Sequence, residues 1–171
     1  MGAASSRFRL EAEGNPAGRT LLFVHGWPDD PAVWDRQVAH FAARHRCVRL
    51  QLPNYGRALD VPGGLDFPEL AGGVGRVVED LSRERGAPVV LIGHDWGAFL
   101  AYLVERQVPE RIARMVTLDV GARMEVRSAK DAALILGYQW PLVAAWLLGG
   151  VAPSVGARLT AGIARREIGR A

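Results

Sequence analysis

Short apolar runs and amphipathic stretches alternate along the first two thirds of the chain. Four apolar runs predict strands, at Thr20–Val24, Cys47–Leu50, Val89–Ile92 and Ile112–Asp119, and the first two of them are expected to be buried. Between them, hydrophobic residues recur at helical spacing in three stretches that end near Arg44, Gly86 and Val108. Strands that alternate with helices imply right-handed crossovers, so the pattern predicts an α/β fold with a parallel sheet covered on both faces.

The first strand is predicted to lie at the edge of this sheet. Apolar and polar residues alternate along Phe8–Ala12, which is typical of an edge strand. The turn Gly14–Gly18, which contains two glycines and a proline, predicts a hairpin-like connection into the strand that begins at Thr20.

The pattern changes after Asp119, and residues 120–171 predict helices without a strand. The stretch Ala132–Ala157 contains no charged residue, which raises a transmembrane helix as a hypothesis. Gln139, two prolines and a pair of glycines interrupt this stretch. We therefore favour helices that face an apolar chamber over membrane insertion. The predicted organisation is a segment 1–119 followed by a segment 120–171.

The composition is that of an ordinary globular domain, with 171 residues, 49% hydrophobic residues and a formal net charge of +3. The arginines are scattered rather than clustered, so we expect solvated surfaces and no nucleic-acid partner. The only cysteine, Cys47, is predicted to be a core residue and can form no internal disulfide. No apolar run precedes Thr20, so no signal peptide is evident and a cytoplasmic location is expected.

The run Val89–Ile92 leads into the sequence Gly-His-Asp-Trp-Gly, with Asp95 at its centre. Strand, sharp turn and helix in this order predict a nucleophile elbow, whose flanking glycines allow a tight backbone and close helix packing. The following helix N-terminus favours negative charge. Asp95 is thus a candidate nucleophile, and the alternative is that it only caps the helix that begins at Trp96.

A second motif, His-Gly-Trp-Pro-Asp-Asp, begins at His25 directly after the strand Thr20–Val24. Together with the elbow, it resembles the α/β-hydrolase family members that use an aspartate nucleophile, and among them most closely the epoxide hydrolases. The resemblance extends to about Asp119 and is loose beyond. It implies that 1–119 is the N-terminal part of an α/β-hydrolase core and 120–171 an incomplete helical cap, so that the chain is expected to be truncated.

The resemblance also implies roles for individual residues. Asp95 would attack a saturated carbon and form an alkyl ester, which needs no prior proton removal. The backbone amides of Trp27 and Trp96 would form the oxyanion hole. The residues that orient the first loop would be His25, Gly26 and Pro28.

Two further roles rest on less specific sequence signals. Tyr138 is a candidate proton donor to the epoxide oxygen, with a plain packing role as the alternative. Asp119 is a candidate acid, or only a residue at a strand end. Tyr55 and Tyr102 are interpreted as loop and helix residues. His94 precedes the nucleophile and is not expected to be the base.

No histidine follows His94, so the histidine that would activate water in this family is missing from the sequence. An ester on Asp95 would then accumulate. The expected substrate is a small apolar epoxide, or a halide if the chain is a haloalkane or haloacid dehalogenase-like hydrolase. A non-catalytic remnant or binding module is the third hypothesis. Neither cofactor nor metal is expected, and an open sheet edge favours self-association or a complementing chain.

Overall fold

The computed structural model describes residues 8–55, 61–120 and 128–168. The chain divides into two compact units, Met1–Ala122 and Arg123–Ala171, which are described separately.

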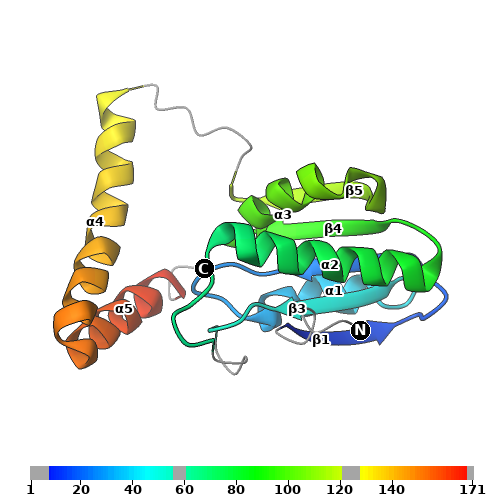
Figure 1. Ribbon diagram of the computed structural model, residues 1–171, viewed down its shortest axis with the longest axis horizontal. Coiled ribbons are helices and arrows are strands. Elements are labelled where there is room, and N and C mark those ends of the chain that lie inside the picture. Colours follow the sequence, from blue (N-terminus) through cyan, green and yellow to red (C-terminus); the bar gives the residue numbers. More distant parts are fainter. Residues whose placement is uncertain (1–7, 56–60, 121–127, 169–171) are drawn as a thin grey trace. The chain divides into compact units, whose positions relative to one another are not determined.

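The first unit is built on one five-stranded sheet (Figure 1). Its strands are β1 (Arg9–Gly14), β2 (Thr20–Val24), β3 (Arg46–Gln51), β4 (Val89–His94) and β5 (Ile112–Leu118). They lie in the order β1-β3-β2-β4-β5, and all neighbours are parallel except β1 and β3. The mostly parallel sheet confirms the predicted fold class.

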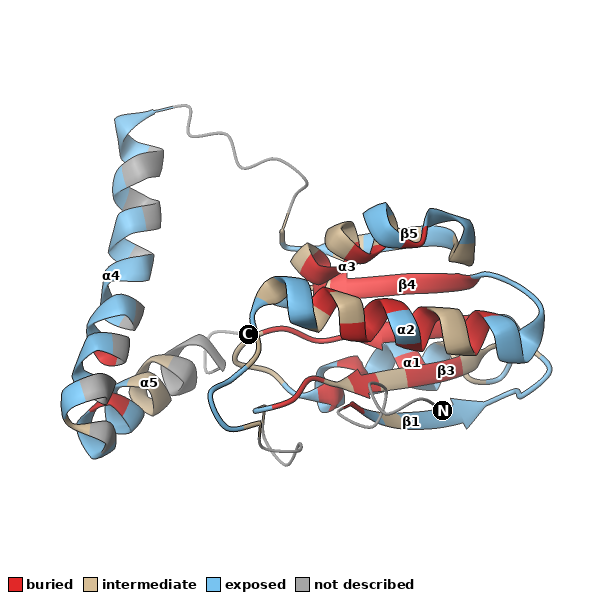
Figure 2. Cartoon of the chain, in the orientation of Figure 1, coloured by how far each residue is buried: buried red, intermediate tan, exposed pale blue. Residues whose placement is uncertain are grey.

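Helices cover both faces of the sheet, and each covered face is an apolar core (Figure 2). The helices of this unit are η2 (Pro31–Trp34), α1 (Asp35–Phe41), α2 (Phe67–Arg85), α3 (Trp96–Gln107) and η3 (Pro109–Arg111). The larger core joins α2 and α3 to the sheet, and the smaller core joins η2 and α1 to its other face. Cys47 is fully buried in the smaller core, as predicted.

The predicted hairpin at Gly14–Gly18 is wrong. Strand β1 pairs with β3, so the turn joins two strands that are not neighbours. The amide of Asn15 donates instead to the carbonyls of Ala42 and His45, in the connection from α1 to β3. Alternation of apolar and polar residues predicts an edge strand, but it does not indicate which strand this edge strand pairs with.

Local sequence signals account for the helix ends. Asp66 and Glu69 form a capping box at the start of α2, and Gly86 ends that helix with a left-handed φ of 60°. The helical stretch predicted to end near Arg44 is divided into the 3-10 turn η2 and α1, and the Asp30 side chain accepts from the amide of Ala32.

The second unit contains α4 (Ala129–Val151) and α5 (Pro153–Ile168), and its described residues contain no strand, as predicted. Pro141 lies inside α4 and does not end it, although an interruption was expected there. In the part of the chain that the structure describes, no helix is sufficiently long and apolar to span a bilayer.

Candidate active site

The elbow between β4 and α3 holds Asp95 in an unusual backbone conformation. Its φ of 50° and ψ of −121° are rare for a residue with a β-carbon. The amide of Asp95 donates to the carbonyl of Leu118 over 3.2 Å, which ties the elbow to the end of β5. The backbone thus presents Asp95 at the edge of the sheet where the parallel strands end.

Glycines let three backbone segments meet around this residue. A β-carbon at Gly97 would lie 2.2 Å from the carbonyl oxygen of Val24, and one at Gly93 would lie 2.4 Å from that of Gly97. A β-carbon at Gly26 would lie 2.5 Å from the Oδ2 atom of Asp95. The glycines of both motifs therefore allow the elbow, the first helical turn of α3 and the loop after β2 to touch.

The carboxylate of Asp95 does not cap α3. It makes no capping hydrogen bond, although Asp95 occupies the N-cap position. Its Oδ2 atom instead accepts a hydrogen bond of 2.8 Å from the amide of Trp27, in the loop after β2. The side chain thus joins the two motifs, and the hypothesis that Asp95 is only a helix cap is not supported.

Two opposing effects act on the pKa of Asp95. Burial raises it, and the charge of Asp119 acts in the same direction. The backbone N–H groups of Trp96 and Trp27 and the nearby His94 lower it. Burial dominates, so the pKa lies above the ordinary value of 3.8 and the carboxylate is a stronger base than a solvated one.

His25 connects the loop after β2 to the end of β3. It is fully buried, its Nδ1–H donates to the carbonyl of Gly26 over 3.0 Å, and its Nε2 accepts from the amide of Leu52 over 3.1 Å. This pair of bonds requires the neutral ring. Burial lowers the pKa of His25 below 6.5, which keeps the ring neutral.

Replacing His25 with leucine is expected to lower the free energy of unfolding by about 2 kcal/mol or more, because two buried backbone groups lose their partners. The wild-type fold should also lose stability as the pH falls below 6.5, since the unfolded chain binds a proton at His25 there and the folded chain does not. Urea unfolding near pH 7.5 and pH 5 measures both effects.

The exposed His40 provides the matched control for this prediction. His40→Leu should leave the free energy of unfolding within about 0.5 kcal/mol of wild type. The prediction is wrong if His25→Leu loses as much stability on acidification as the wild-type chain does.

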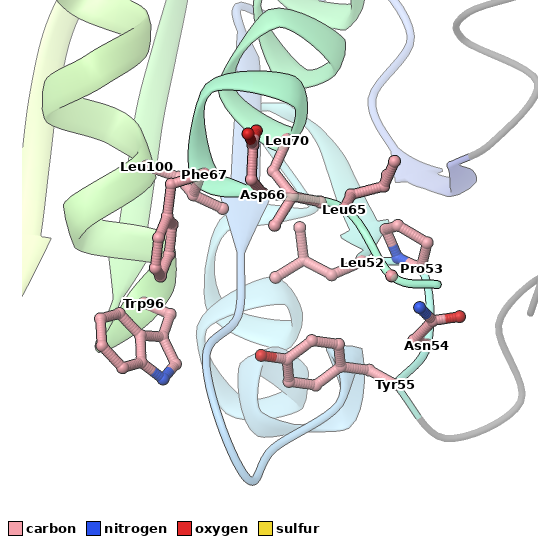
Figure 3. A pocket seen from close by; sticks show the side chains of 11 residues that line it. Leu52, Pro53, Asn54, Tyr55, Leu65, Asp66, Phe67, Leu70, Trp96 and Leu100 are labelled. Carbon is pink, nitrogen blue, oxygen red and sulfur yellow. The ribbon is translucent and has the colours of Figure 1, made fainter. Parts of the chain in front are cut away.

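A cavity of about 380 Å³ lies beside the elbow, between the loop after β3 and the first turns of α2 and α3 (Figure 3). Its lining is mostly apolar and consists of Leu52, Pro53, Asn54, Tyr55, Gly64, Leu65, Asp66, Phe67, Leu70, Trp96 and Leu100. Trp96 is 41% exposed, and its ring packs on Phe67 with centroids 4.9 Å apart. The site is suited to an apolar ligand.

Two residues that line this cavity, Tyr55 and Phe67, have no predicted role in the site. Tyr55 was interpreted only as a loop residue. A usable signal was present, because Tyr55 follows β3 and the carboxyl ends of parallel strands share one edge of the sheet. The neighbouring Asn54 adopts a left-handed φ of 63°, which asparagine tolerates better than most residues.

The other candidates occupy different surroundings. Asp119 is exposed directly after β5, with a φ of 74°, and its charge acts on Asp95. His94 lies against Trp34 in the core covered by α1, with Nδ1 3.5 Å from the Oδ2 atom of Asp29. This places His94 on the face of the sheet opposite the apolar residues that line the cavity.

Pro28 follows a cis peptide bond with Trp27. Tyr138 belongs to α4, but its side chain is outside the part of the structure that is described. No group of three or more potential metal ligands occurs among the described residues.

This fold and these two motifs define a known class of protein. The chain belongs to the alpha/beta hydrolase family, whose model matches residues 21–169.

Its similarity within the family is to epoxide hydrolases. It is 30% identical to "Epoxide hydrolase 4" of Mus musculus over 113 residues, which cover 66% of this chain and 31% of that protein. It is 32% identical to "Epoxide hydrolase 2" of Caenorhabditis elegans over 117 residues, which cover 67% of this chain and 32% of that protein. The chain thus spans about a third of the length of these curated relatives.

A solved structure shows the same fold. A Bacillus megaterium epoxide hydrolase in complex with an inhibitor superposes with a TM-score of 0.67 and 22% identity. The match covers 88% of this chain and 57% of that one. At this level of identity the similarity concerns the fold alone.

Proposed function

We propose that the chain carries the nucleophilic half of an epoxide hydrolase, and that Asp95 opens an epoxide by forming an alkyl ester. The observation that carries this proposal is the 2.8 Å hydrogen bond from the Trp27 amide to Oδ2 of Asp95. It holds one carboxylate oxygen in the loop and orients the other for attack on a saturated carbon. A carboxylate raised in pKa by burial is also the more nucleophilic one.

Hydrolysis of the ester requires stabilisation of an oxyanion. Water would add to the carbonyl carbon of the Asp95 ester, and the charge would develop on the oxygen that the Trp27 amide already contacts. The Trp96 amide, which also lowers the pKa of the carboxylate, is the second donor. Among residues 1–171 no histidine follows His94, so we expect these residues by themselves to form the ester without hydrolysing it.

The apolar cavity beside the elbow supports a small apolar epoxide as substrate. In this proposal residues 120–171 form part of a cap, and the family resemblance implies Tyr138 as a candidate proton donor and Asp119 as a candidate acid. The ring of Trp96, which lines the cavity, favours a second candidate, a dehalogenase-like hydrolase, because an indole N–H can hold a departing halide.

Intact mass after incubation with styrene oxide tests the proposal, with Asp95→Asn as the decisive variant. A single persistent adduct that the variant lacks supports the nucleophile. A folded chain that forms neither adduct nor diol excludes it and favours a non-catalytic binding module.

The rate of this alkylation should rise with pH, because only the ionised carboxylate attacks. The midpoint should lie above 3.8, since burial raises the pKa of Asp95. Adduct formation measured by mass from about pH 3.5 to 7 reports the midpoint. A midpoint at or below 3.8 contradicts the expected environment of the carboxylate.

A further inference from the structure

The cavity beside the elbow contains few polar side chains, and two of them are already engaged. The Asn54 amide exchanges hydrogen bonds with the backbone of Val61, and the Asp66 carboxylate accepts from the amide of Glu69 at the start of α2. The Tyr55 hydroxyl has no hydrogen-bond partner among the described residues. It is therefore available to a ligand.

The position of the Tyr55 ring is fixed from two sides. Its edge contact with His25 has ring centroids 5.3 Å apart and an interplanar angle of 71°. The backbone carbonyl of Tyr55 accepts a 2.7 Å hydrogen bond from the Gln51 side chain. In Figure 3 the ring extends from the loop across the cavity, with its hydroxyl directed toward the side where Trp96 lies.

Tyr55 is also coupled electrostatically to the candidate nucleophile. Burial, and then the negative charge of Asp95, raise its pKa to about 12. The hydroxyl is thus protonated at neutral pH and can donate a proton. When the Asp95 carboxylate becomes a neutral ester, one of the two causes that hold the proton on Tyr55 disappears.

We propose that the Tyr55 hydroxyl is the proton donor to the epoxide oxygen when Asp95 attacks. This inference rests on the proposed function, and it supplies a donor from the sheet unit itself, independently of Tyr138. The carboxylate oxygen of Asp95 forms a bond to the epoxide carbon, and the carbon–oxygen bond of the ring breaks with its electron pair moving to the oxygen. That oxygen takes the Tyr55 proton and becomes a hydroxyl, and water then reprotonates the phenolate.

Two probes of similar shape separate proton donation from a packing role. Opening styrene oxide leaves an alkoxide that needs a proton, whereas benzyl bromide releases bromide, which needs none. Tyr55→Phe should slow the Asp95-dependent adduct with styrene oxide by about 100-fold, the usual contribution of a general acid. The adduct with benzyl bromide should form within about threefold of the wild-type rate, because binding and the nucleophile are retained.

The matched control is Tyr102→Phe, because the Tyr102 hydroxyl is bonded to Thr117 over 2.8 Å and lies outside the cavity lining. It should leave both rates unchanged. Equal slowing of both probes by Tyr55→Phe, or slowing of neither, overturns the inference while the proposed function stands. No Asp95-dependent adduct in the wild-type chain with either probe overturns both.

A second variant keeps the test valid if Tyr55→Phe does not fold. Site-specific replacement of Tyr55 by 3-fluorotyrosine keeps the ring and the hydroxyl but lowers the hydroxyl pKa. The loss of the styrene oxide reaction at alkaline pH should then move to lower pH, and the benzyl bromide reaction should not move. An unchanged profile for styrene oxide contradicts proton donation by Tyr55.

Discussion

Styrene oxide is expected to add one equivalent of its mass to the chain, and Asp95→Asn to abolish this adduct. The physical reason is the environment of the carboxylate. It is partly buried, which raises its pKa, and the Trp27 amide donates a hydrogen bond to its Oδ2 atom. An asparagine keeps the shape of the side chain but loses the charge that attacks carbon. The expected loss is complete within the sensitivity of intact mass measurement, and peptide mapping should place the wild-type adduct on Asp95.

The adduct on residues 1–171 should also persist, because none of these residues after Asp95 is a histidine that could activate water. Asp80 is a matched control, since it is a carboxylate on α2 that is paired with Arg83 over 2.8 Å. Asp80→Asn should be alkylated like the wild-type chain. Release of the diol in several turnovers would contradict accumulation of the ester, and an adduct retained in Asp95→Asn would assign the reaction to another group.

Gly97→Ala is expected to destabilise the fold by about 3 kcal/mol or more. The added β-carbon would lie 2.2 Å from the carbonyl oxygen of Val24 and 2.6 Å from that of His25. Both atoms belong to the backbone at the end of β2, so no side chain can move aside. The helix or the strand must shift, and this shift would also break the contact between the two motifs.

Thermal unfolding measures this effect, and a loss of this size corresponds to a decrease in Tm of about 10 °C for a chain of this length. Gly72→Ala is the control, because it lies in α2 and an added β-carbon meets only the end of the Arg76 side chain, at 3.6 Å. That variant should gain up to about 1 kcal/mol from the better helix propensity of alanine. Equal Tm values for the two variants would contradict the close packing at Gly97.

The sequence by itself determined most of the strands and helices and the sharp turn that carries Asp95. Apolar runs predicted β2 to β5, because such runs are typical of strands in a sheet covered by helices, and the structure confirms these strands. Their burial differs, since β2 and β4 lie inside the sheet whereas β5 lies at its edge and is mostly exposed. The elbow motif predicted the strand, turn and helix around Asp95, since its glycines are needed wherever a backbone must approach another closely. Both signals are local, and each is carried by residues adjacent in the chain.

Only the tertiary structure decided which distant groups meet. It paired β1 with β3 instead of β2, bonded the Trp27 amide to Asp95, and placed Tyr55 in the cavity beside the elbow. Each contact joins segments that are far apart along the chain, and its existence depends on strand order and on the shared carboxyl edge of the sheet. Periodicity describes how one segment is buried and does not specify its neighbour, so it could predict neither the partner of β1 nor the contact between Trp27 and Asp95.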